Sequence, residues 1–332
     1  MLNPFLRYAC RGFLILASLS PCVLAAKKPK ALNEAYVTVN GIQLHCVTTG
    51  KGQLILFLHG FPEFWYEWKD QLREFGKDHL VVAPDLRGYN LSDKPSSLDE
   101  YRVPVLLEDI RGLADHFRQG RKFILVAHDW GGGLAWGFAI AHPEYLEKLI
   151  IINAPHPTIF EKLLANDPDQ QKASQYMFLL RSPRAEEQLS ANNYALLVEN
   201  VLANLLKTGA FTEADKAAYL KAWSQPGALT GGLNYYRANQ VGPPAPPQVE
   251  KAIGPSAIEF DPDSTHTRVL VATLVIWGEK DTALVVKNLD GLEQYVPHLT
   301  IKRVPDGSHW VIHERPTEVN GYIWTFIHQK NS

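Results

Sequence analysis

The chain has 332 residues, a hydrophobic fraction of 46% and a formal net charge of −2. This length allows one large domain or two ordinary ones, and the hydrophobic content suffices for a substantial core. The charge shows no basic excess of the kind that nucleic-acid-binding proteins carry. We therefore expect an ordinary globular protein without a nucleic-acid partner.

The N-terminus differs in character from the rest of the chain. Arg7 and Arg11 precede a short apolar stretch at 12–25 that ends in small residues, which is the pattern of an export signal. The stretch is short and is interrupted by Pro21, so it does not suit a membrane span, although an uncleaved anchor is the alternative. We expect a signal peptide over 1–25 and a periplasmic or secreted protein without stable membrane insertion once the signal is removed.

The next segments predict a sheet. Alternating apolar and polar residues around Asn40 and Gly41 predict a β-hairpin over 35–48. Short apolar runs predict buried strands, because strands of a parallel sheet covered on both faces show no alternation; the runs are 54–58, 79–83, 123–127 and 149–152. Helices are predicted between them at 65–75, 101–117 and 134–141. This alternation predicts a mostly parallel sheet with helices on both faces and an antiparallel edge.

From 155 to 265 the strand signal is replaced by a helical one. Helices are predicted at 170–180, 193–207, 213–223 and 229–239. The α/β pattern then resumes, with strands at 269–277 and 300–304 and helices at 287–295 and 317–328. We predict an eight-stranded α/β core formed by 26–154 and 266–332, with a helical lid over 155–265 inserted after the sixth strand.

The strand that begins at Phe123 runs into Asp129, which Trp130 and three glycines follow before the next helix. A tight strand-to-helix turn of this kind presents a nucleophile at the C-terminal edge of the sheet, and only glycine fits beside it. A carboxylate nucleophile attacks saturated carbon and forms an ester that water must cleave. The substrate should therefore carry an epoxide oxygen or a halide. The alternative for Asp129 is a helix N-cap.

Cleavage of such an ester needs a base that activates water, and the base needs an orienting acid. Asp281 follows a predicted strand, and His309 lies between the last strand and the last helix. The chain order of nucleophile, acid and histidine is that of the α/β-hydrolase fold. We predict that His309 is the general base and Asp281 its orienting acid, with Glu279 as a rival for the acid.

The turn that contains His59, Gly60, Phe61 and Pro62 ends the strand expected beside the one that leads to Asp129. A backbone N–H in such a loop can stabilise an oxyanion together with the N–H of the residue after the nucleophile. We assign these two donors to Phe61 and Trp130. A turn without a catalytic role is the alternative.

These motifs together resemble the epoxide hydrolases of the α/β-hydrolase fold, a superfamily that also contains haloalkane and haloacetate dehalogenases. The resemblance covers nearly all of the chain after the export segment; its motifs lie at 59–68, 83–89, 128–132, 277–281, 307–310 and 316–319. It implies an enzyme that opens a small-molecule epoxide with water to a vicinal diol, through an ester on Asp129 and without a cofactor.

In that family, two lid tyrosines donate hydrogen bonds to the epoxide oxygen. Tyr236 matches the second of them, and because adjacent helical residues point about 100° apart, only one of Tyr235 and Tyr236 can face Asp129. The first tyrosine matches Tyr176 or, with another gap placement, Phe178, which would leave the lid with one proton donor. We also expect His59, Pro62, Tyr235, Phe178 and Trp310 to line the substrate pocket.

The alternative activity is dehalogenation with the same nucleophile. Haloacetate dehalogenases have an arginine directly after the nucleophile, where this chain has Trp130. Haloalkane dehalogenases usually have asparagine or tryptophan where this chain has Phe61. Both differences favour an epoxide as the substrate. A non-catalytic binding protein of the same fold is a further alternative. The histidines lack metal-ligand spacing, and removal of the signal would leave Cys46 alone, so no metal site is expected. The oligomeric state is left open.

Overall fold

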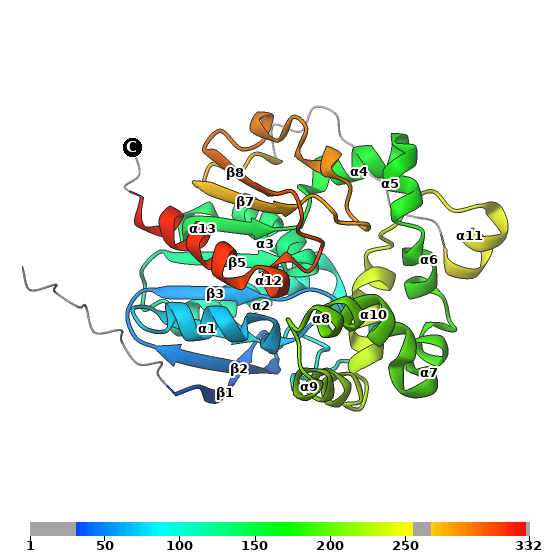
Figure 1. Cartoon of the computed structure of the whole chain (residues 1–332), viewed down its shortest axis with the longest axis horizontal. Helices are drawn as coiled ribbons and strands as arrows, with labels where there is room; N and C mark the ends of the chain where they lie inside the picture. Colours follow the sequence, from blue (N-terminus) through cyan, green and yellow to red (C-terminus); the bar gives the residue numbers. More distant parts are fainter. Residues whose placement is uncertain (1–30, 255–266, 330–332) are drawn as a thin grey trace, which may run out of the picture.

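The computed structural model describes residues 31–254 and 267–329, so the predicted export segment lies outside the described residues. Eight strands form one sheet; they are β1 (Asn33–Val39), β2 (Ile42–Gly50), β3 (Leu54–Leu58), β4 (Leu80–Pro84), β5 (Phe123–His128), β6 (Leu146–Ile152), β7 (Thr273–Gly278) and β8 (Leu299–Val304). Their order is β1-β2-β4-β3-β5-β6-β7-β8 (Figure 1). β2 pairs antiparallel with β1 and β4, and the other neighbours are parallel. The predicted mostly parallel sheet is confirmed.

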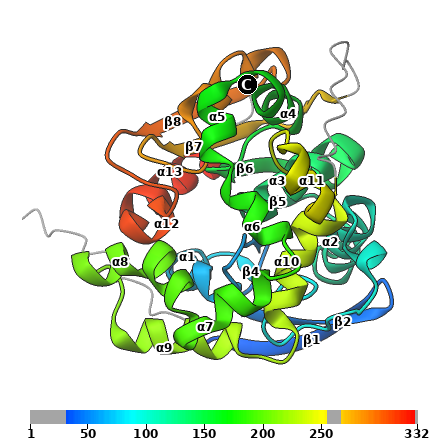
Figure 2. The ribbon, with the colours of Figure 1, turned by 90° about the vertical axis from the view of Figure 1, so that its right-hand side faces the viewer.

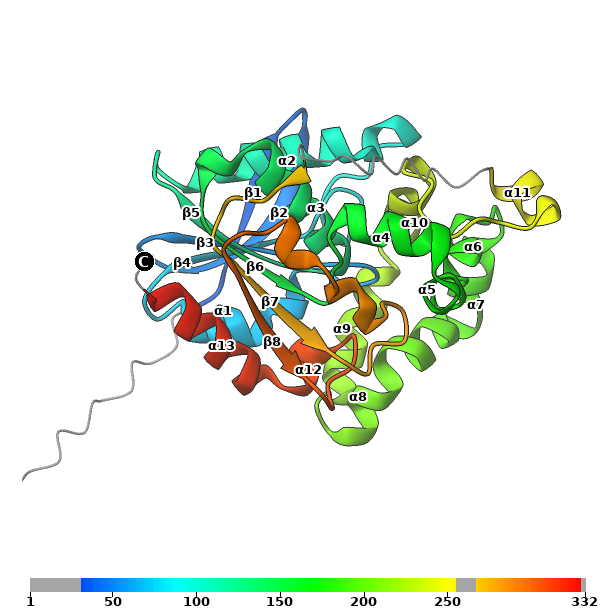
Figure 3. The ribbon, with the colours of Figure 1, turned by 90° about the horizontal axis from the view of Figure 1, so that it is seen from above.

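Helices cover both faces of the sheet (Figure 3). One face carries α1 (Lys69–Phe75), α12 (Val311–Glu314) and α13 (Pro316–His328), and the other carries α2 (Val103–Phe117) and α3 (Asp129–Ala141). Short 3₁₀ turns connect the elements; they are η1 (Trp65–Trp68), η2 (Leu98–Tyr101), η3 (Pro143–Tyr145), η6 (Val286–Leu289) and η7 (Leu292–Gln294).

The central strands are buried on both faces, as their uninterrupted apolar sequences predict. In β3, Leu56 and Leu58 join the core on the side of α2 and α3, whereas Ile55 and Phe57 join the core on the side of α1 and α13. Successive side chains of a strand point to opposite faces, so one strand serves both cores. This double burial fixes the strand ends in place, and the candidate site lies at those ends.

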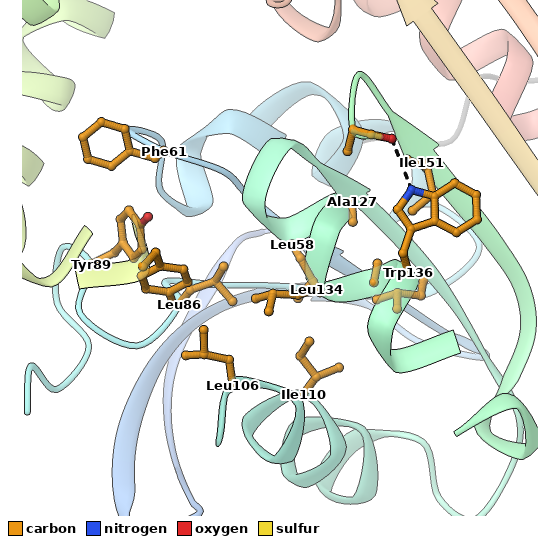
Figure 4. Packing of buried hydrophobic residues seen from close by; sticks show 14 of the residues in the cluster. Leu58, Phe61, Leu86, Tyr89, Leu106, Ile110, Ala127, Leu134, Trp136 and Ile151 are labelled. Carbon is orange, nitrogen blue, oxygen red and sulfur yellow. Dashed lines mark hydrogen bonds between the residues drawn. The ribbon is translucent and has the colours of Figure 1, made fainter. Parts of the chain in front are cut away.

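Figure 4 shows the core beneath α2 and α3. Leu58 of β3 and Ala127 of β5 face Leu106 of α2 and Leu134 of α3 across this core, and all four are buried. Burial of each large aliphatic side chain contributes roughly 1.5–3 kcal/mol. The indole of Trp136 also donates a hydrogen bond of 3.2 Å to the carbonyl of Ala154, which ties α3 to the loop after β6.

Between β6 and β7 the described residues form helices and turns; these are α4 (Pro157–Asn166), α5 (Pro168–Ala173), α6 (Tyr176–Arg181), α7 (Ala185–Leu197), the π-turn η4 (Val198–Leu202), α8 (Ala203–Thr208), α9 (Glu213–Trp223), α10 (Ala228–Ala238) and α11 (Pro247–Ile253). Figure 2 looks onto this helical layer. It is tied to the loops at the carboxyl ends of the strands, because Trp223 donates to the carbonyl of Pro62 and Tyr235 donates to that of Arg87.

Three helix predictions are wrong in detail. The predicted helix at 170–180 is broken between α5 and α6, where the side chain of Ser174 accepts a hydrogen bond from Gln170. The predicted helix at 287–295 is two 3₁₀ turns, because Gly291 between them has a φ of 75°. The predicted start at 193 falls within left-handed residues that include Asn192 and Asn193, and asparagine tolerates that conformation better than most side chains. None of the helices in the described part of the chain is long and apolar enough to cross a membrane.

Candidate active site

Asp129 lies at the sharp turn where β5 passes into α3. Its φ is 49°, a left-handed conformation that side chains other than glycine rarely adopt. Two glycines allow the close approach of the neighbouring strand: a Cβ on Gly60 would lie 2.3 Å from the Cβ of Asp129, and a Cβ on Gly131 would lie 2.3 Å from the carbonyl oxygen of Leu58. The structure therefore has the tight turn that the glycines predict, with a carboxylate at its apex.

The two oxygens of Asp129 have different surroundings. Oδ1 accepts a hydrogen bond of 2.8 Å from the backbone N–H of Phe61, and Oδ2 lies 3.5 Å from Nε2 of His309. Burial alone would raise the pKa of Asp129, but His309 and the N–H of Phe61 outweigh it and lower that pKa. Trp130, the other predicted oxyanion donor, is the second residue of α3, where backbone N–H groups have no partner within the helix.

His309 is held between two carboxylates. Its Nδ1 donates a hydrogen bond of 2.7 Å to Oδ2 of Asp281, and its Nε2 faces Asp129. Burial would lower the pKa of His309, but the charges of Asp281 and Asp129 raise it to about 10. The imidazole is therefore protonated at neutral pH while Asp129 carries its charge.

Asn153 is a residue of this site that sequence reasoning missed. Its Nδ2 donates to Oδ2 of Asp281 at 2.8 Å and to the carbonyl of Gly278 at 3.2 Å, and its Oδ1 accepts from the N–H of Gly278 at 2.8 Å. The N–H groups of Ala283 and Leu284 bind the other oxygen of Asp281. The signal that was available is a polar residue directly after a buried strand.

Two tyrosines of the helical layer lie near the nucleophile. The ring centroid of Tyr236 in α10 lies 5.5 Å from that of Phe61 and 5.2 Å from that of Trp130, and its hydroxyl lies close enough to Tyr176, the first residue of α6, to interact with it. Tyr176 keeps 37% of its surface accessible, and the protein atoms around its hydroxyl partly desolvate it. This desolvation and the charge of Asp129 raise the pKa of Tyr176 well above 10, and desolvation, Tyr176 and Asp129 do the same to the pKa of Tyr236. Both hydroxyls therefore keep their protons at neutral pH.

The other residues expected in the pocket have varied surroundings. His59 is fully buried, with Nδ1 donating to the carbonyl of Gly60 at 2.8 Å and Nε2 accepting from the N–H of Leu86 at 3.0 Å. Tyr235 is also fully buried and its hydroxyl binds Arg87. The remaining three are Pro62 after a cis peptide bond, Phe178 half-buried on α6, and Trp310 with its ring 4.8 Å from that of His309. That these five residues line the pocket stays a prediction.

Behind the site, three buried side chains within the described ranges are close enough to surround a cation. They are Glu63, Glu67 and His313, whose polar atoms lie within 4.8 Å of one another. Hydrogen bonds occupy most of these atoms, because Tyr219 donates to Glu63, His313 lies 3.3 Å from the other oxygen of Glu63, and Glu67 contacts His128. We therefore interpret this group as a hydrogen-bond network.

The chain matches the family described as alpha/beta hydrolase fold over residues 53–316. It is 40% identical to AB hydrolase superfamily protein YfhM of Bacillus subtilis, over 88% of this chain and 96% of that protein. It is 36% identical to Epoxide hydrolase 4 of Mus musculus, over 92% of this chain and 84% of that protein. Among solved structures, an epoxide hydrolase from Bacillus megaterium is similar with a TM-score of 0.79 and 38% identity, over 89% of this chain and 100% of that chain.

Proposed function

The chain belongs to the α/β-hydrolase fold family and, within it, to the epoxide hydrolases, and on this premise we propose that it opens epoxides to vicinal diols through an ester on Asp129. The observation that carries the proposal is a carboxylate at the apex of the turn, with His309 on one side and two tyrosine hydroxyls nearby. An epoxide oxygen is a poor leaving group unless it is protonated, and the two tyrosine hydroxyls provide that proton.

In the first step, Oδ2 of Asp129 attacks an epoxide carbon, since Oδ1 is bound by the N–H of Phe61. The C–O bond of the ring breaks, and Tyr236 and Tyr176 donate hydrogen bonds and a proton to the released oxygen. The product is an alkyl ester of Asp129 that carries a free hydroxyl.

Formation of the ester changes the charge beside His309. The negative charge of Asp129 disappears, and that charge is one of the two that raise the pKa of His309. The imidazolium therefore becomes a better acid and returns a proton to the tyrosine pair. This leaves a neutral His309, held at Nδ1 by Asp281, which is the form that a general base requires.

In the second step, Nε2 of His309 removes a proton from water, and the hydroxide attacks the carbonyl carbon of the ester, which is Cγ of Asp129. Negative charge develops on Oδ1, where the N–H groups of Phe61 and Trp130 stabilise it. The ester bond then breaks, and the departing diol oxygen takes the proton of the new carboxyl group. Asp129 is again a carboxylate and His309 an imidazolium, which is the resting state.

The similar enzyme from Bacillus megaterium supports the choice of a first substrate, because a variant of it has been solved with its product, a naphthyloxy propanediol. We propose naphthyl glycidyl ether as the first substrate to test. Intact-protein mass of His309→Gln after incubation should show a gain equal to the whole epoxide, since the variant forms the ester but does not cleave it. Asp129→Ala should show no gain.

The same experiment separates the alternatives. A mass gain from a haloacid equal to the acid minus hydrogen halide, with none from epoxides, would establish a dehalogenase instead. Absence of any adduct together with absence of turnover by the wild type would favour a binding protein. Full turnover of the epoxide by Asp129→Ala would refute the covalent mechanism.

We also propose that residues 155–265 act as the lid that closes over the substrate, and that residues 1–25 direct export of the protein. Two bonds from this segment to the core, those of Trp223 and Tyr235, support the first proposal. For the second, N-terminal sequencing of the protein recovered outside the cytoplasm should begin at residue 26, and an intact residue 1 would contradict it.

A further inference from the structure

His128, the residue before the nucleophile, lies directly behind the catalytic histidine. Its Nε2 is 3.0 Å from the backbone carbonyl oxygen of His309, and the centroids of the two imidazole rings are 4.6 Å apart. A carbonyl oxygen only accepts hydrogen bonds, so Nε2 of His128 must carry the hydrogen. This contact fixes the backbone from which the catalytic imidazole projects.

The other ring nitrogen of His128 meets a buried carboxyl group. Nδ1 lies 2.5 Å from Oε1 of Glu67, and both residues are essentially inaccessible to solvent. Two arrangements satisfy this contact. Either a neutral carboxylic acid donates its O–H to a neutral imidazole, or a carboxylate accepts from a doubly protonated, cationic His128.

The groups around the pair favour the neutral arrangement. Glu63 brings a second buried carboxyl group close to Glu67, and Oε2 of Glu67 is buried without a hydrogen-bond partner among the described residues. A carboxylate in this place would leave negative charge unsolvated beside another acid, which is costly. Burial, followed by the charges of Glu63 and Asp129, raises the pKa of Glu67 well above its usual value and outweighs the opposite effect of the backbone N–H of Gly60.

The surroundings of the His128 imidazole also favour a neutral pair. A cationic His128 would stand next to His309, which is itself cationic in the resting enzyme. Burial, and next the charge of His309, lowers the pKa of His128 well below 6.5. The remaining titratable neighbours of the pair are His313 and Tyr219, which are hydrogen-bonded to Glu63, and neither supplies Glu67 with a cationic hydrogen-bond partner.

We propose that Glu67 is a protonated carboxylic acid that acts as a positioning residue: its O–H holds the Nδ1 of His128, whose Nε2–H in turn holds the backbone of His309. The proposal rests on the proposed function and extends it. His309 must gain and lose a proton in every turnover, and a permanent cation at His128 would oppose that gain. The neutral pair orients His309 without adding charge beside it.

The test compares two substitutions at Glu67. In Glu67→Gln, an amide N–H replaces the acid O–H as donor to Nδ1, so single-turnover ester hydrolysis should stay within about threefold of the wild-type rate. In Glu67→Val the donor is lost, and hydrolysis should slow by about ten- to a hundredfold, the effect of a small displacement of a catalytic group. Formation of the ester should change far less, so the adduct accumulates in Glu67→Val.

Leu113→Ala serves as the matched control, because it removes buried packing on α2, remote from His309. It should lower stability and leave the ratio of the two rates unchanged. Infrared difference spectra supply a readout that a structural role would not move: at pH 7 the wild type should show a protonated carboxyl C=O band that Glu67→Gln lacks. The infrared band also shows whether Glu67 is protonated if Glu67→Val fails to fold.

Three kinetic or spectroscopic results would overturn the proposal. They are an absent carboxylic acid band, equal slowing of hydrolysis by Glu67→Gln and Glu67→Val, and equal slowing of both chemical steps in Glu67→Val. A stoichiometric metal ion found by elemental analysis of the purified protein would also overturn it, since Glu67 would then be ionised. Absence of an ester in every variant, including His309→Gln, would refute the proposed function, whereas the infrared band reports on Glu67 independently.

Discussion

Replacement of Asn153 by alanine tests how Asp281 is held. The substitution removes three buried hydrogen bonds, two to the backbone of Gly278 and one to Asp281. At about 1 kcal/mol each, their loss costs roughly 3 kcal/mol, and the buried N–H of Gly278 left without a partner adds roughly 1–2 kcal/mol. Asn153 also has a φ of 38°, in the left-handed region that alanine adopts less readily than asparagine. The free energy of unfolding should therefore fall by about 4–5 kcal/mol.

The Asn153→Ala substitution should affect one chemical step, the hydrolysis of the ester. Asp281 keeps its bonds from Ala283, Leu284 and His309, so the acid stays in place but is oriented less firmly. We expect ester hydrolysis to slow by about tenfold, equivalent to about 1.4 kcal/mol. In the proposed mechanism, formation of the ester depends on Asp129, Tyr176 and Tyr236, and its rate should be nearly unchanged.

Urea denaturation measures the first effect, and single-turnover kinetics followed by intact-protein mass measures the second. Asn166→Ala is the matched control, because Asn166 is exposed and donates only to the carbonyl of Lys162. That variant should change stability by less than about 1 kcal/mol. Equal stability of Asn153→Ala and the wild type, or equal slowing of both steps, would refute the role assigned to Asn153.

Three other predictions concern the turn, the charge of His309 and a buried ion pair. In Gly60→Ala the new Cβ would lie 2.4 Å from Oδ1 of Asp129, so ester formation should be lost while the circular dichroism spectrum is kept; a normal rate of ester formation would contradict this. Because the pKa of His309 is raised from 6.5 to about 10, its stabilising contacts with Asp129 and Asp281 are complete below pH 6.5 and are lost as the pH rises through about 10. We expect kcat/KM and the unfolding temperature to fall over that upper range, and His309→Gln to show no such fall in unfolding temperature; identical profiles would refute the assignment. Arg87→Met should lower the free energy of unfolding by about 3–5 kcal/mol, because Asp109 is left buried without the two guanidinium bonds of 2.7 Å. The control Arg102→Met breaks an exposed pair with Asp99 and should change stability by less than about 1 kcal/mol in the same urea titration.

The sequence predicted the sheet and the three residues Asp129, Asp281 and His309 because each depends on local pattern. All three lie beyond the ends of strands of the sheet, and the carboxyl ends of parallel strands meet at one edge. Membership of the epoxide hydrolases, predicted from the motifs, is confirmed by the comparisons. The roles of these residues and of Phe61, Trp130 and the lid tyrosines stay predictions until the variants are measured.

What the sequence could not reveal depends on which segments become neighbours. Asn153 binds Asp281 only because β6 pairs with β7. The order of strands in a sheet cannot be predicted from the sequence of any single strand. Glu67 lies on a short turn before α1, and nothing in that turn indicates that it meets His128. The positions of Tyr176 and Phe178 follow the break between α5 and α6, which depends on packing of the helical layer and not on its apolar period.

The pairing of β6 with β7 also affects how the chain folds and which insertions the sheet tolerates. β6 and β7 are direct neighbours, so the residues between them leave and re-enter the sheet at adjacent positions. Closing a loop of roughly 120 residues in place of a six-residue connection costs only about 3 kcal/mol more in chain entropy. The sheet can therefore form with almost any insertion at this point, and a helical segment from another protein could be exchanged there while the strands that hold the catalytic residues keep their register.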